Sequence, residues 1–152
     1  MFCVTTDYRT DSGDPEPYLR RIADAGFTHV HWCHEWNTDF LYSADEVERI
    51  GRMLSEFGLQ LLDLHGSSGK KRNWVSPAEP ARRAGVELVI NRIEMTSRLG
   101  GRTMIMHVPR SAETNLPGSP LERSLAEIRP VASRAGVRIA IENRADDSFE
   151  AI

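Results

Sequence analysis

The sequence predicts an α/β protein with a parallel sheet, built from a strand–helix unit that repeats along the chain. Helical segments close on Gly26, Gly58, Gly100 and Gly136, and a short apolar run follows each of them. The repeat has about the length of one strand plus its crossover helix. An ionisable side chain stands at the end of most of these runs. In a parallel sheet such positions converge on one rim, which favours a metal or acid–base site there.

The first half of the chain contains two strand–helix units. The first strand is expected over residues 2–6, and Asp14-Pro15 then offers an N-cap and a first-turn proline for a helix. The second strand is expected over 28–33. A capping box, Ser43 with Glu46, opens the second helix, in which each side chain satisfies a free backbone donor of the other residue.

The second half continues the same alternation. Strands are expected over residues 60–65, 103–108 and 138–142. Two further capping boxes, 76–79 and 119–122, are expected to open the two intervening helices. The order is therefore five strands alternating with four helices, with right-handed crossovers.

Alternation along the strands places polar side chains on the face away from the helices, namely His31, Asp63, His65, His107 and Glu142. A sheet covered by helices on both faces would hide these groups, whereas the interior of a barrel near its mouth displays them. The pattern therefore favours a barrel over an open sheet.

Composition sets limits on the class of protein. With 152 residues, 40% of them hydrophobic and 27% charged, the chain is expected to form one globular domain over residues 1–152. The net charge of -3 gives no general attraction to nucleic acid or anionic membranes. No signal peptide or membrane-spanning run is evident, so a cytoplasmic location is expected. Cys3 and Cys33 lack a CxxC spacing and are expected to be reduced thiols in strands.

Four segments at the ends of helices and strands resemble the xylose-isomerase-like TIM-barrel superfamily: 25–27, 64–66, 99–109 and 135–143. The superfamily includes sugar isomerases and epimerases and the endonuclease-four-type apurinic endonucleases, and the strand ending in Glu142-Asn143 is its most specific feature here. The resemblance implies a partial TIM barrel of five strands and four helices, truncated before the fifth helix, whose opening turn would lie at 146–152. The alternative is a self-sufficient five-stranded flavodoxin-like sheet.

The resemblance implies a metal site at the strand ends. In the resembled sugar enzymes, the glutamate at the position of Glu142 is a divalent-metal ligand and often one of two glutamates that move the substrate proton. His107 and His65 match positions where the apurinic endonucleases hold zinc, and where the sugar enzymes more often line the substrate pocket. An inward carboxylate also needs a partner on physical grounds, either a metal ion or a cation such as Arg144.

A cluster at the end of the second strand supplies candidate substrate-binding residues, His31, His34 and Trp36. A flat aromatic ring beside hydrogen-bonding groups suits a sugar, which has an apolar face and a rim of hydroxyls. Many relatives place a glutamate where this chain has His31. The basic run 70–72, in the loop after His65, could receive a substrate phosphate or carboxylate, or could simply be solvated.

The resemblance implies the N-terminal portion of a metal-dependent sugar or sugar-phosphate isomerase/epimerase. The reaction would remove a proton next to a carbonyl, with bound Mn²⁺, Mg²⁺, Co²⁺ or Zn²⁺ stabilising the enediolate. The second base and most ligands would lie on strands six to eight, so this chain alone is expected to bind metal weakly and to show little or no activity. Two alternatives stay open: an apurinic DNA-repair phosphodiesterase, disfavoured by the acidic charge, and a non-catalytic half-barrel whose open sheet edges would favour self-association.

Overall fold

A single parallel sheet forms the centre of the computed structural model, which describes residues 2–6, 13–66, 69–107 and 118–142. Its strands are β1 (Cys3–Thr5), β2 (His29–Trp32), β3 (Gln60–His65), β4 (Thr103–His107) and β5 (Arg138–Glu142). They pair in sequential order, β1-β2-β3-β4-β5, and all four pairings are parallel. Sequential order confirms the barrel-type prediction, because a flavodoxin-like sheet reverses its strand order near the middle.

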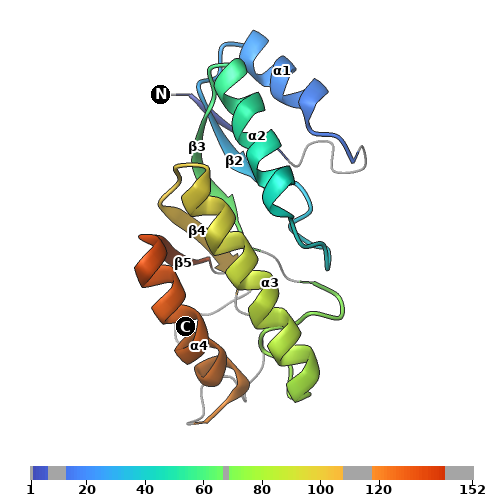
Figure 1. Ribbon diagram of the computed structural model, residues 1–152, viewed down its shortest axis with the longest axis vertical. Coiled ribbons are helices and arrows are strands. Elements are labelled where there is room, and N and C mark those ends of the chain that lie inside the picture. The colour runs from blue at the N-terminus through green and yellow to red at the C-terminus, as the bar shows by residue number, and fades with distance from the viewer. Residues whose placement is uncertain (1, 7–12, 67–68, 108–117, 143–152) are drawn as a thin grey trace.

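Four helices lie as one layer over one face of this sheet (Figure 1): α1 (Glu16–Asp24), α2 (Ala44–Glu56), α3 (Glu79–Arg98) and α4 (Pro120–Ala135). The core lies between the two layers. Its strand side chains include Val30, Trp32, Leu64, Met104 and Met106, all almost fully buried. Alternate strand residues such as Thr103, Ile105 and Glu142 are only half-buried or exposed, although His65, among them, is buried. We refer to their side of the sheet as the open face.

The expected capping box at Ser43 is confirmed. The Glu46 N–H donates to Ser43 Oγ at 3.2 Å, and the Ser43 N–H donates to the Glu46 carboxylate at 2.7 Å. At α4 only half of the expected box forms. Ser119 Oγ accepts from the Glu122 N–H at 3.2 Å, but the Glu122 carboxylate accepts from the N–H of Gly118 instead of Ser119.

The expected box at 76–79 is wrong, because α3 begins at Glu79 with Ala78 in extended conformation as its N-cap. Ser76 Oγ instead accepts from the Ala78 N–H at 3.2 Å. Pro80 explains the later start. A helix capped by Ser76 would need the Pro80 nitrogen to donate to the Ser76 carbonyl, and proline has no N–H and would clash there. Starting at Glu79 puts Pro80 in the first turn, where no donor is needed.

The cap of α1 is also shifted. Pro15, not Asp14, is the N-cap residue, and it makes no side-chain cap hydrogen bond. The Asp14 carboxylate still accepts from the Glu16 N–H at 3.2 Å, so the aspartate stabilises the first turn from one residue further out.

A bulge in β3 aligns the polar residues of the open face. Val30 pairs with Leu61, but His31 pairs with Asp63, so Leu62 is an extra residue in this register. Leu61 therefore packs in the core beside Val30, while Asp63 lies next to His31 on the open face. The His31 Nδ1 and an Asp63 carboxylate oxygen are directly hydrogen-bonded.

Strands β1 and β5 are the two edges of the sheet. Phe2, next to β1, and Ile141, on β5, are exposed apolar side chains at these edges. Self-association through the edges stays a prediction. Cys3 lies half-buried in β1 and Cys33 is buried one residue after the end of β2, and neither is in a disulfide. Within the described ranges, no helix has the length and apolar character needed to cross a membrane.

Candidate metal centre

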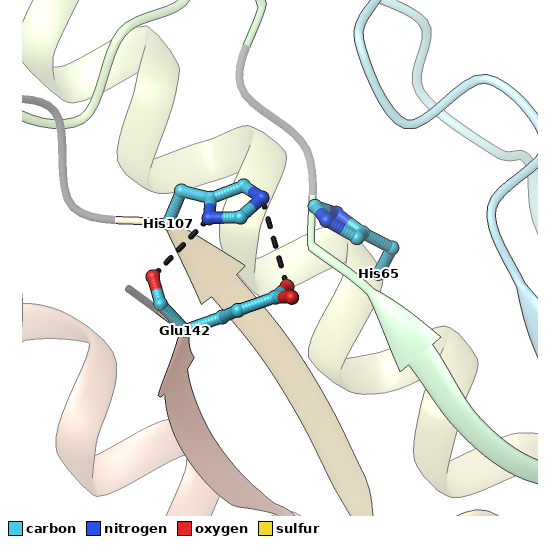
Figure 2. A group of neighbouring side chains, drawn as sticks. All are labelled: His65, His107 and Glu142. Carbon is cyan, nitrogen blue, oxygen red and sulfur yellow. Dashed lines mark hydrogen bonds and ion pairs between the residues drawn. The ribbon is translucent and has the colours of Figure 1, made fainter. Parts of the chain in front are cut away.

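Three strand ends bring His65, His107 and Glu142 together (Figure 2). Each residue is the last of its strand, on β3, β4 and β5. His107 and Glu142 are direct partners in the β4–β5 register. Their potential ligand atoms all lie within 4.8 Å of one another, and no other group of three histidine, cysteine or acidic residues does so in the described part of the chain. The convergence expected from the strand–helix repeat is therefore present.

Hydrogen bonds to backbone carbonyls orient both imidazole rings. The His65 Nδ1 lies 3.0 Å from the Gly66 carbonyl oxygen, and the His107 Nδ1 lies 3.2 Å from the Glu142 carbonyl oxygen. A carbonyl can only accept, so each Nδ1 carries the proton of the neutral ring. Each Nε2 is then left with a free lone pair. Metal-binding histidines in proteins typically have this arrangement, with the second ring nitrogen bonded to a carbonyl or carboxylate.

The Glu142 carboxylate faces one of these lone pairs. Its Oε2 lies 3.6 Å from the Nε2 of His107 (Figure 2). With the His107 ring neutral, both atoms are acceptors, and two acceptors at this separation repel each other. A cation between them, or a proton on the imidazole, removes the repulsion. Two imidazoles and one carboxylate are a donor set that zinc and other divalent cations accept, so these residues fit a divalent metal.

Burial keeps His65 in the form that a metal requires. Removal from water lowers the pKa of His65, and the nearby His107 and His31 rings lower it further. The hydrogen bond to Gly66 and the Glu142 charge oppose this shift without reversing it. His65 is therefore neutral at pH 7, with its Nε2 lone pair available.

Gly66 lets the chain turn in closely beside β4, directly after His65. Its N–H donates to the Ile105 carbonyl at 2.6 Å. A Cβ at this position would lie 2.6 Å from Met106 Cγ. A side chain here would push the turn outward, and the carbonyl that orients His65 would move with it.

The structure brings two of the three candidate substrate-binding residues to this centre. The Trp36 ring lies 4.5 Å from the His65 ring and 6.4 Å from the His107 ring, measured between centroids. The His31 ring lies 6.0 Å from His65. His34 lies elsewhere: it is buried, with its ring 6.0 Å from Trp32, a core residue. A substrate contact by His34 stays a prediction.

The basic run 70–72 is tied to the loop after β2. The backbone N–H groups of Lys71 and Arg72 donate to the Asp39 carboxylate at 3.1 and 2.8 Å. The Arg72 guanidinium also pairs with Glu87 at 2.8 Å. Asn143, Arg144, the loop at 108–117 and the expected fifth-helix opening lie outside the described residues.

Residues 19–150 match the protein family described as Xylose isomerase-like TIM barrel, and the chain belongs to this family. A curated relative, the uncharacterized protein y4fM of Sinorhizobium fredii, is 30% identical over 82% of this chain and 48% of its own length. The chain therefore spans about half the length of this relative.

Solved structures of the same fold include sugar epimerases. D-psicose 3-epimerase, crystallised in the presence of D-fructose, superposes with a TM-score of 0.71 at 19% identity, over 97% of this chain and 54% of the epimerase. 3-keto-D-glucoside 4-epimerase of E. coli superposes with a TM-score of 0.68 at 18% identity, over 93% of this chain and 55% of the epimerase. A xylose isomerase-like TIM barrel protein of Mycobacterium smegmatis, in complex with magnesium, superposes with a TM-score of 0.60 at 16% identity, over 90% of this chain and 49% of that protein. The chain thus corresponds in fold to about half of a TIM barrel of this kind.

Proposed function

We propose that this chain forms one side of the active site of a metal-dependent sugar or sugar-phosphate isomerase or epimerase. The observation that carries the proposal is the arrangement of His65, His107 and Glu142. One potential ligand atom from each residue lies within 4.8 Å of the others, and the Nε2 of His107 lies 3.6 Å from the Glu142 carboxylate. These three residues would hold a divalent cation of the Mn²⁺, Mg²⁺, Co²⁺ or Zn²⁺ class. Once bound, such a cation polarises a substrate carbonyl and stabilises the negative charge that develops there.

The side chains around the cation site suit a carbohydrate. The Glu142 carboxylate could accept the proton from the carbon next to the carbonyl. The indole of Trp36 could stack against the apolar face of the sugar. His31, with its Nδ1 bonded to Asp63, presents an Nε2 that can accept a hydrogen bond from a sugar hydroxyl.

The chain spans about half the length of its relative, and this limits the metal binding and turnover that we expect from it alone. A catalytic metal usually has three protein ligands held rigidly. Here Glu142 stands on an edge strand, and its side chain is 52% exposed. Weak metal binding and little or no turnover are therefore expected from this chain by itself. The net charge of -3 gives no support to a DNA substrate.

Saturation-transfer NMR tests the proposal without requiring turnover. We expect D-fructose or D-tagatose to receive saturation from the chain when Mg²⁺ is present. The signal should disappear with EDTA and in Glu142→Gln, and mannitol, which lacks the carbonyl, should give a much weaker one. A ketose signal that persists after Mg²⁺ removal would contradict the proposal, as would no signal at all. Salt-dependent binding to an abasic duplex, with no ketose signal, would favour the repair alternative.

A further inference from the structure

A buried arginine on α3, Arg92, lies under the loop that carries Trp36. Only 1% of Arg92 is exposed. Its Nη2 donates to the carbonyl oxygen of Phe40 at 2.8 Å and to that of Glu35 at 3.4 Å. The Nη2 has two N–H groups and can donate to both carbonyls at once, so it joins two points of the loop over residues 33–42.

The neighbouring residues of α3 and the loop complete this attachment. Asn91 donates to the Tyr42 carbonyl at 2.8 Å and accepts from the Tyr42 N–H at 3.0 Å. The Arg92 guanidinium carbon lies 4.4 Å from the centre of the Tyr42 ring. The Tyr42 hydroxyl in turn donates to the His34 carbonyl at 3.0 Å. Burial lowers the pKa of Arg92 to about 10, so the side chain remains a cation at pH 7.

The loop needs such support because its backbone is strained. Glu35 has a φ of 58°, and it is the only described residue other than glycine with a positive φ. This conformation is unfavourable for a residue with a Cβ and persists only where the surroundings impose it. The Glu35 carbonyl is held by Arg92 and by Thr38 Oγ1, the latter at 3.1 Å. Trp36 is the next residue, so the same constraint limits the direction in which its Cα–Cβ bond leaves the backbone.

We infer that Arg92 is a positioning residue that holds Trp36 against the His65 and His107 rings. A residue of helix α3 thus determines, through the loop, where the Trp36 ring lies beside the candidate metal centre. We call this side of the centre, formed by Trp36, its wall. The assignment of that wall to sugar stacking rests on the proposed function. The placement of Trp36 by Arg92 does not, and it can be tested without metal or sugar.

The test uses the ring-current shift that the Trp36 indole imposes on the imidazole protons of His65 and His107. The metal-free chain is measured by NMR at pH 8, and Trp36→Leu defines the shift without the indole. We expect Arg92→Met to lose most of the Trp36-dependent shift. Arg92→Lys should retain part of it, because an ammonium group keeps the charge but lacks the second nitrogen, Nη1, which donates to Asn91 Oδ1 at 2.6 Å while Nη2 holds the loop carbonyls.

Arg82→Met is the matched control. Arg82 is also a buried arginine of α3, but it pairs with Glu79 and Glu127 far along the helix from this loop. Its replacement should cost stability and leave the imidazole shifts unchanged. Full shifts in folded Arg92→Met would overturn the inference, and so would an equal loss in Arg82→Met. If Arg92→Met does not fold, wild-type shifts in both Arg92→Lys and Asn91→Ala would overturn it.

Discussion

Gly85→Ala is expected to destabilise the chain by at least about 2 kcal/mol, although alanine is the better helix former. Gly85 lies inside α3, where the backbone of the segment before the helix crosses it. A Cβ at Gly85 would lie 2.1 Å from the backbone nitrogen of Trp74 and 2.4 Å from the carbonyl carbon of Asn73. Trp74 cannot easily move aside, because its side chain is fully buried and its carbonyl accepts a hydrogen bond from Ser124.

Gly51→Ala provides the matched control for this prediction. Gly51 lies inside α2, and its added Cβ would meet only Leu99 Cδ2, at 3.4 Å. Here helix propensity should prevail and stabilise the chain by up to about 1 kcal/mol. Urea unfolding followed by circular dichroism measures both variants. Equal changes in the free energy of unfolding of the two variants would contradict the close backbone contact between Gly85 and Trp74.

Glu142→Gln is expected to weaken Mn²⁺ binding at least about tenfold, the lower end of what is lost even when an outer-shell partner of a metal ligand is removed. The substitution keeps the size of the side chain and removes its charge. Its effect on folding should be small, because the Glu142 side chain is half exposed. Glu94→Gln, an exposed position on α3, is the control for a general change of charge. Calorimetric titration of the three proteins should give similar curves for wild type and Glu94→Gln, whereas similar curves for all three would rule out Glu142 as a ligand.

Much of the fold could be predicted because its signals are local. Glycine after each helix, the capping box at Ser43 and apolar alternation in the strands all act within a few residues. The convergence of His65, His107 and Glu142 followed from the geometry of parallel strands alone. The box at 76–79 failed for an equally local reason, the missing N–H of Pro80, which takes priority over the serine–glutamate pattern.

The support of the site could not be predicted, because it depends on contacts between residues far apart in the sequence. Arg92 reaches Glu35 and Phe40, and Asp39 receives the N–H groups of Lys71 and Arg72. Helical spacing places Arg92 on the buried face of α3, three and four residues from Val89 and Thr96, but the loop carbonyls that it binds could not be inferred from that spacing. The direction of the His34 side chain could not be predicted either. His34 lies in a turn just after β2, where the alternation of side chains along the strand no longer applies.

Paramagnetic broadening by Mn²⁺ tests the central claim, a cation site at the ends of β3, β4 and β5, most directly. Stepwise addition of Mn²⁺ to the wild-type chain should first broaden the imidazole signals of His65 and His107, even where binding is weak. His29 is the first residue of β2, at the opposite end of the sheet from the site. Its signals should stay sharp at the same concentrations, because the broadening falls steeply with distance from the ion. Early loss of the His65 and His107 signals, together with that of the neighbouring His31, reversed by EDTA, is the predicted result. Broadening that begins elsewhere, or that affects all five histidines equally, would contradict the site described here.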